Sequence, residues 1–141
     1  MKQSSAIPFF LCSLFLMLSA TGCSKPVIPT EGVVRFSDGS PVQSGSIEFR
    51  RVTDKERFAS RIRPNGQFTP EDSRGVIGLP VGTYEVVVVQ IVLTEDLALE
   101  SHDHGMSVPR RFADYYTSGL KVVVAKGDAR PIDLVLPESD S

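Results

Sequence analysis

The sequence predicts an all-β protein, a single seven-stranded antiparallel β-sandwich. Short runs rich in β-branched and aromatic residues recur along the chain. Glycine, proline, asparagine and aspartate, which favour turns, separate these runs. After residue 30, no segment carries a convincing helical period of apolar residues. Together these features are typical of two sheets built from short, hairpin-connected strands.

Alternation of polar and apolar residues defines the first expected strands. Ile47 and Phe49 share one face of their run, and Phe58 and Ile62 share one face of the next. The Asn-Gly pair that begins at Asn65 is a strong signal for a tight turn. The strands expected in this half of the domain are residues 31–36, 46–50, 58–63 and 67–69.

Continuous apolar character defines the later strands. Residues 83–93 are mostly β-branched and apolar on both faces, so we expect a central strand there. Residues 120–124 and 132–136 complete the set, with a turn around Gly127 between them. Each buried Val, Leu, Ile or Phe contributes roughly 1.5–3 kcal/mol, so the core needs no covalent cross-links.

The N-terminus carries the features of an export signal. Lys2 precedes an apolar stretch over residues 6–18, and small residues follow before Cys23. The stretch is too short for a membrane-spanning helix, which needs roughly 20 residues. We therefore expect the segment to be removed on export.

Residues 18–23 resemble the lipobox of bacterial lipoproteins, although Ala20 stands where that motif usually carries Leu. The resemblance implies that lipid is attached to the Cys23 thiol and that cleavage makes this cysteine the first residue. The protein would then be membrane-anchored in the bacterial cell envelope, on the periplasmic or the outer face. The alternative is an ordinary signal peptide that is cut nearby.

These features divide the chain into four segments. Cys12 would leave with the signal, so no thiol would remain to pair with a lipidated Cys23. The net charge of −2, with both signs interspersed, argues against a nucleic-acid partner. The segments are a lipoprotein signal peptide (1–22), a lipidated N-terminus and tether (23–30), a β-sandwich domain (31–137) and an acidic tail (138–141).

Residues 38–49, 65–68 and 79–86 carry an ordered set of turn and strand motifs. The set resembles carboxypeptidase regulatory-like domains, which are transthyretin-like (prealbumin-like) and Ig-like seven-stranded sandwiches. Residues 108–122 look like the C-terminal half of small bacterial lipoproteins built on that domain. Mild departures are Asn65 for a commoner Asp and Val81 for a commoner Pro or Ala. The resemblance implies a non-catalytic envelope module without a cofactor.

No arrangement of residues in the sequence indicates catalysis. The chain has neither a Gly-x-Ser-x-Gly elbow nor a phosphate-binding loop. Ser118 lies beside Gly119 with no base next to it, so we expect a turn residue there. The hydrolase branch of transthyretin-like proteins closes with Tyr-Arg-Gly-Ser, and this chain does not. We therefore expect a protein that is not an enzyme, whose partners are the membrane and other envelope proteins or polymers.

Residues 94–111 form the one long connection in the expected strand order. Connections beyond roughly 12–15 residues are usually functional or disordered. Residues 94–100 could form one or two helical turns. The alternative function is therefore a metal- or small-ligand-binding envelope protein that uses this loop, and a solvated polar loop is the simpler explanation. The weak candidate ligands are His102, Asp103 and His104, with Glu100 or Asp114 to complete a site.

Charged and aromatic residues lie at the end of this connection. Arg110 and Arg111 could form a patch for an anionic ligand, although a solvated charge pair is the simpler explanation. Phe112, Tyr115 and Tyr116 could bind a sugar or a peptide. Aromatic residues that lead into a strand more often pack on the edge of a sandwich, and that is what we expect here.

Overall fold

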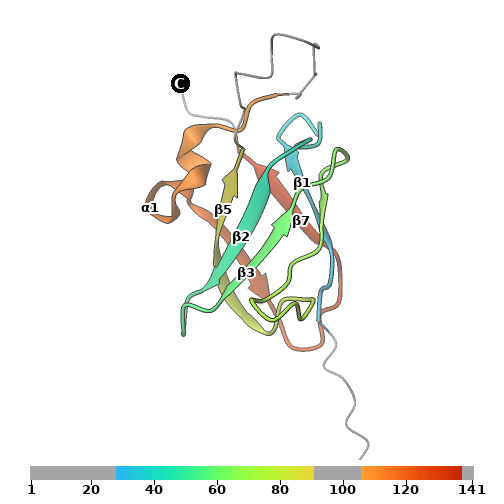
Figure 1. The fold of residues 1–141 in the computed structure, drawn as a ribbon, viewed down its shortest axis with the longest axis vertical. Coiled ribbons are helices and arrows are strands. Elements are labelled where there is room, and N and C mark those ends of the chain that lie inside the picture. Colours follow the sequence, from blue (N-terminus) through green and yellow to red (C-terminus); the bar gives the residue numbers. More distant parts are fainter. Residues whose placement is uncertain (1–27, 91–105, 138–141) are drawn as a thin grey trace, which may run out of the picture.

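Two β-sheets form the framework of the described protein. The computed structural model describes residues 28–90 and 106–137. Its strands form a three-stranded sheet in the order β4-β1-β7 and a four-stranded sheet in the order β3-β2-β5-β6 (Figure 1). The all-β prediction is confirmed. The elements are β1 (Gly32–Phe36), β2 (Ser46–Arg51), β3 (Arg57–Arg61), β4 (Gln67–Phe68), β5 (Gly82–Val89), the 3-10 helix η2 (Arg110–Ala113), α1 (Tyr115–Ser118), β6 (Leu120–Val124) and β7 (Ile132–Leu136).

One hydrophobic core joins the two sheets. Val34 of the three-stranded sheet belongs to the same buried cluster as Ile47 and Phe49 of the four-stranded sheet. The ring centroid of Phe49 lies 5.6 Å from that of Phe68 and 6.4 Å from that of Tyr84. Both Ile47 and Phe49 are fully buried, which confirms the alternation predicted for their strand.

The strand directions give the domain two different poles. β1 and β7 begin where Gly32 pairs with Ile132, and β5 begins where Gly82 pairs with Val124. The chain enters at this end, where the Leu79 amide donates a hydrogen bond to the Pro29 carbonyl at 3.0 Å. We call this end the entry pole, and the opposite end, where β1, β5 and β7 finish, the distal pole (Figure 1).

One strand pair contradicts the predicted antiparallel pattern. β1 and β7 pair in parallel over their whole length, from Gly32 with Ile132 to Phe36 with Leu136. The reason is topological. β6 runs toward the entry pole, and the connection after Val124 crosses from one sheet to the other. β7 therefore starts at the entry pole, where β1 also starts, so the two strands run in the same direction. Parallel strands of this kind are joined by a crossover connection and not by a hairpin.

A short helical segment precedes β6, although the sequence predicts no helix after residue 30 other than the turns that residues 94–100 could form. The Asp114 carboxylate caps α1 by accepting a hydrogen bond from the Tyr116 amide at 2.7 Å. Gly119, with φ of 65°, ends the helix. Within residues 28–90 and 106–137, no helix is long and apolar enough to cross a membrane. The helical turns expected over residues 94–100, and residues 91–93 of the expected central strand, lie outside the described residues.

The predicted turns and the short strand at Phe68 are confirmed. Gly39 has φ of 88° and Gly66 has φ of 80°, a region that suits glycine and few other residues. The Gly66 carbonyl accepts a hydrogen bond from the Val34 amide at 2.9 Å, so this turn is tied to β1. Phe68 then places its ring in the core.

Candidate functional site

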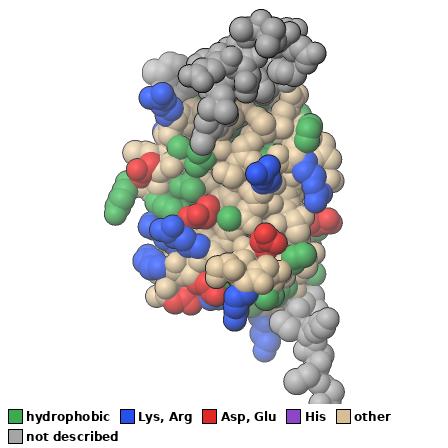
Figure 2. All heavy atoms as spheres, in the orientation of Figure 1, with side chains coloured by type: hydrophobic (Ala, Val, Ile, Leu, Met, Phe, Trp, Pro, Cys, Tyr) green, Lys and Arg blue, Asp and Glu red, His purple; other side chains and the backbone are tan. Residues whose placement is uncertain are grey.

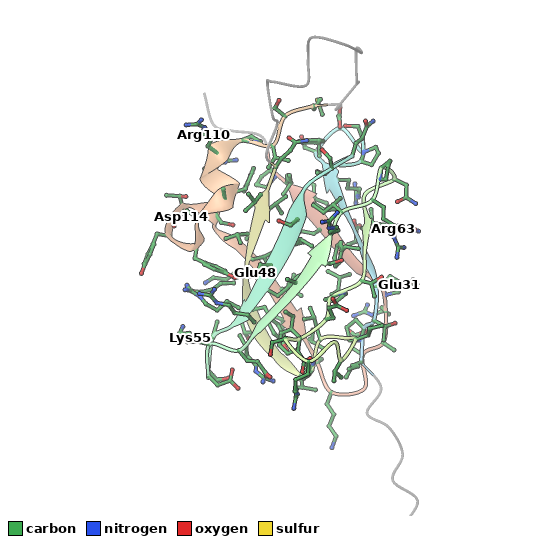
Figure 3. The ribbon with its side chains drawn as sticks, in the orientation of Figure 1. Glu31, Glu48, Lys55, Arg63, Arg110 and Asp114 are labelled. Carbon is green, nitrogen blue, oxygen red and sulfur yellow. The ribbon has the colours of Figure 1, made fainter. Side chains whose placement is uncertain are left out.

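A polar cluster lies on the outer face of the four-stranded sheet. The hydroxyl of Tyr115 donates a hydrogen bond to Glu48 Oε1 at 2.6 Å, which ties α1 to β2. The guanidinium carbon of Arg50 lies 3.8 Å from the Tyr115 ring centroid, in cation–π contact. Arg50 also donates to Glu85 Oε2 from two nitrogens, at 2.8 and 3.0 Å. In Figure 3, Glu48 lies between Lys55, toward the entry pole, and Arg110, toward the distal pole.

The pKa shift in this cluster favours a structural role over a role in proton transfer. The hydrogen bonds from Arg50 hold the pKa of Glu85 below its ordinary value. A catalytic acid at neutral pH needs the opposite, a carboxyl whose pKa is raised toward 7. The other carboxyls with a shifted pKa in residues 28–90 and 106–137 are shifted downward as well. They are Asp38, Asp54, Asp72, Asp128 and Asp133.

Two tyrosines make the stability of the domain depend on pH in the alkaline range. Burial raises the pKa of Tyr84 from its ordinary value of 10.0 to about 12. Burial, followed by the hydrogen bond to Glu48, raises the pKa of Tyr115. A group whose pKa is raised by folding contributes stability at pH values below its ordinary pKa. This stability is lost as the pH rises from the ordinary pKa through the pKa of the folded state. The free energy of unfolding should therefore fall above pH 10.

We expect Tyr115→Phe to reduce this alkaline loss by about half, because two tyrosines share it. The measurement is the melting temperature between pH 9 and pH 12. Tyr116→Phe is the matched control, since the Tyr116 side chain is 93% exposed. An alkaline loss that is unchanged in Tyr115→Phe, or equally reduced in the control, would contradict this assignment.

The hydroxyl of Ser118 serves the fold, although the residue is the last of α1 and not the turn residue that the sequence predicts. It is buried and donates a hydrogen bond to the carbonyl of Val86 on β5. It also accepts a hydrogen bond from the Leu120 amide at 3.2 Å. Both bonds are to backbone groups, so they fix α1 and β6 against β5 and do not activate the hydroxyl as a nucleophile.

An apolar cleft of about 360 Å³ opens at the distal pole. Phe36 and Leu136, the last residues of β1 and β7, form its floor together with Phe112 of η2. Met106, Pro109 and Pro137 also line it, and its polar lining residues are Ser37, Asp38 and Ser107. A cleft of this size and lining suits a small apolar group or a side chain of a partner.

The aromatic residues near the cleft have different environments. Phe112 is fully buried and belongs to the core, so it packs inside the domain rather than on the edge of the sandwich. Tyr116 is exposed and Tyr115 is half-buried against Glu48, so the three rings do not form one binding patch. Arg111 donates a hydrogen bond to the Pro137 carbonyl at 2.8 Å and lies over the Phe112 ring, whereas Arg110 is exposed.

The other predicted site residues are placed as follows. Asp114 caps α1 with its carboxylate, so its position is explained by the helix. No group of three or more potential metal ligands occurs within residues 28–90 and 106–137. The metal-site hypothesis therefore stays a prediction. Cys23, Glu100, His102, Asp103 and His104 lie outside the described residues.

Comparisons with protein-family models, with curated proteins and with solved structures find no match for this chain.

Proposed function

We propose that this chain is a non-catalytic, lipid-anchored protein of the bacterial cell envelope. In this proposal the two sheets form one transthyretin-like, Ig-like sandwich of the carboxypeptidase regulatory-like type. The observation that carries the proposal is Cys23, which directly follows an export-like leader and precedes the described domain by only a few residues. The lipid holds the domain at the membrane, and the domain binds other envelope proteins or polymers.

The position of the chain entry supports this arrangement. Pro29 is buried and bonded to Leu79 at the entry pole, so a lipid attached at Cys23 would hold that pole toward the bilayer. The distal pole, with its apolar cleft between β1, β7 and η2, would then point away from the membrane. Such an orientation suits a module that presents a binding surface to a partner.

The paired polar groups of the domain support a non-catalytic role. The carboxylates of Glu48 and Glu85 bond to Tyr115 and Arg50, and the Ser118 hydroxyl bonds to backbone groups. These side chains serve the fold: the pKa of Glu85 is lowered, whereas a general acid needs it raised, and the Ser118 hydroxyl bonds only to backbone groups.

The energetics of acylation explain how one residue could fix the location of the whole chain. Each buried methylene of an acyl chain contributes about 0.8 kcal/mol to membrane binding. A single chain anchors a protein only reversibly, whereas two or more give stable attachment. The lipobox resemblance places all of this chemistry on the thiol and amino group of Cys23.

We expect Cys23→Ser to abolish incorporation of labelled palmitate, because the acceptor thiol is lost. Cys12→Ser is the matched control, since Cys12 is the other cysteine of the chain and lies in the leader. The measurement is the label in the protein after immunoprecipitation, with the total amount of protein as reference. Label that persists in Cys23→Ser, or that disappears equally in both variants, would overturn the proposal.

A further inference from the structure

A group of exposed apolar side chains lies at the entry pole. Val76, Ile77 and Val81 are 56%, 50% and 51% exposed, and all three lie within the connection between β4 and β5. Single exposed apolar residues are common on protein surfaces, but a cluster on one loop is typical of an interaction surface. We call the segment that carries them, residues 73–81, the apolar loop.

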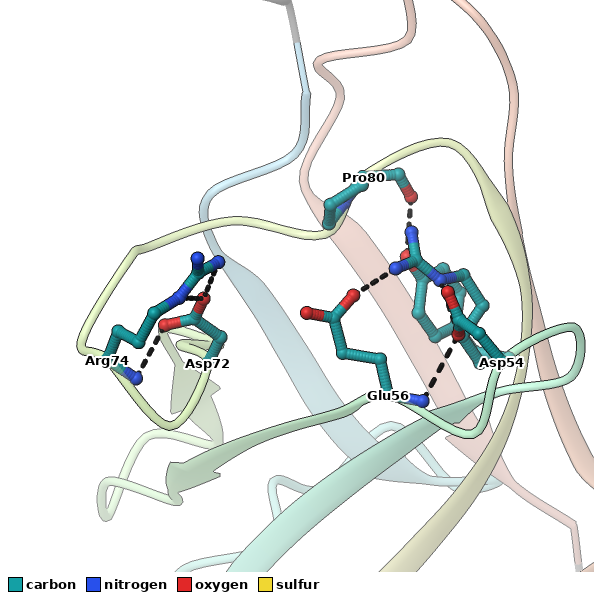
Figure 4. A network of polar contacts seen from close by, with 7 residues as sticks. Asp54, Glu56, Asp72, Arg74 and Pro80 are labelled. Atoms are coloured by element: carbon teal, nitrogen blue, oxygen red, sulfur yellow. Dashed lines mark hydrogen bonds and ion pairs between the residues drawn. The ribbon is translucent and has the colours of Figure 1, made fainter.

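The apolar loop is held in one conformation by a buried carboxylate. The side chain of Asp72 is only 4% exposed. Its Oδ1 accepts hydrogen bonds from the amides of Arg74 and Val76 at 2.8 and 2.9 Å, and its Oδ2 accepts two from the Arg74 guanidinium (Figure 4). The Val76 carbonyl in turn accepts a hydrogen bond from the Asp72 amide at 3.0 Å. The exposed valine and isoleucine are therefore presented by a pre-formed loop.

The apolar loop also contacts the point where the chain enters the domain. A Cβ atom at Gly78 would lie 2.6 Å from Ile28 Cδ1, so the loop backbone packs directly on the first described residue. The Leu79 amide bonds to the Pro29 carbonyl immediately beside it. Figure 2 shows a few hydrophobic side chains at this end of the molecule, among acidic and basic ones.

Two arginines at the entry pole are paired with aspartates. The guanidinium groups of Arg74 and Arg130 pair with Asp72 and Asp128 at 2.6 and 2.8 Å. These two cations are therefore paired within the domain, so the surface of the apolar loop does not rely on them for binding. Apolar burial is the interaction that it offers.

The length of the connecting chain limits how far this surface can lie from an anchor at Cys23. Cys23 and Ile28 are separated by five peptide units, which span at most about 18 Å when fully extended. The acylated end itself lies at the boundary between headgroups and acyl chains. The apolar loop is therefore kept within reach of the same lipid surface.

We infer that the apolar loop docks on the bilayer, with Val76, Ile77 and Val81 in the boundary between headgroups and acyl chains. The inference rests on the lipid anchor proposed above, which brings the loop to the membrane. Docking fixes the tilt of the domain and gives the anchor a second, apolar point of contact. The occupant of this surface is a lipid leaflet, so neither a second copy of the chain nor a protein partner covers it.

The test uses the lipidated full chain, purified from envelopes and reconstituted into phosphatidylethanolamine–phosphatidylglycerol vesicles. Ile77→Cys introduces a free thiol for a polarity-sensitive fluorophore, because Cys12 leaves with the leader and Cys23 carries lipid. Val76→Cys is a second labelling site on the same loop, and Arg110→Cys at the distal pole is the control. Vesicles with brominated acyl chains quench a fluorophore only where it enters the lipid.

We expect blue-shifted emission and strong bromolipid quenching at positions 77 and 76, at least about fivefold more than at position 110. Equal quenching at all three positions would overturn docking. Blue-shifted emission without quenching at position 77 would also overturn it, because protein and not lipid would then cover the loop. Flotation of the labelled chain with vesicles reports the anchor separately. A chain that floats without quenching refutes docking alone, whereas a chain that does not float refutes the proposed anchor and the docking that rests on it.

Discussion

Phe49→Ala should lower the free energy of unfolding by about 3–5 kcal/mol, the usual cost of removing a fully buried phenylalanine. The Phe49 side chain is completely buried, and its ring packs between those of Phe68 and Tyr84. Phe49 and Phe68 belong to opposite sheets, so the cavity would open where the two sheets meet. The measurement is urea unfolding of the purified protein, followed by circular dichroism.

Tyr116→Ala is the control for this prediction, because it removes an aromatic ring of similar size from an exposed position on α1. We expect its effect to stay within about 0.5 kcal/mol, as for most surface substitutions. A cost below about 1 kcal/mol for Phe49→Ala would mean that the two sheets do not share this core.

Gly66→Ala should destabilise the domain by about 2–4 kcal/mol, from backbone strain and a steric clash together. Gly66 has φ of 80°, and a Cβ atom there would lie 2.5 Å from the Val34 carbonyl oxygen. That oxygen belongs to the central strand of the three-stranded sheet and cannot move without disturbing its pairing. The same urea unfolding experiment measures the effect.

Gly39→Ala separates the cost of backbone strain from the cost of the steric clash. Gly39 has nearly the same φ, 88°, but a Cβ atom there would meet nothing within 4 Å. We expect only the strain, about 1–2 kcal/mol. Equal costs for the two alanine variants would contradict the contact between the turn and β1.

The local features of this fold could be predicted from the sequence because their causes are local. Alternation around Phe49 and Phe58 predicts which residues enter the core, and Asn65 followed by Gly66 predicts the turn. The parallel pairing of β1 with β7 could not be predicted in this way. It depends on which sheet the chain joins after β6, and no short motif encodes that choice.

The helical turns before β6 were missed for a related reason. Residues 110–118 are too short for an apolar period, and the cap at Asp114 is a single residue. The hydrogen bond between Tyr115 and Glu48 joins residues that are 67 positions apart, so it cannot be recognised before the fold is known. The Asp72 turn, in contrast, could have been found, because an aspartate that bonds amides two and four residues later is a common turn motif.

The candidate sites also differ in whether the sequence alone reveals them. The lipid-attachment hypothesis depends on a contiguous motif that ends at Cys23, so sequence alone suffices to state it. The distal cleft and the apolar loop depend on segments brought together by folding, as Phe36 and Leu136 are at the cleft. They become visible only with the structure.

Intact and peptide mass spectrometry of the protein extracted from envelopes tests the central proposal most directly. The proposal predicts a first residue Cys23 whose mass is increased by a diacylglyceryl group, with residues 1–22 absent. A chain that begins elsewhere, or a Cys23 with an unmodified thiol, would contradict it.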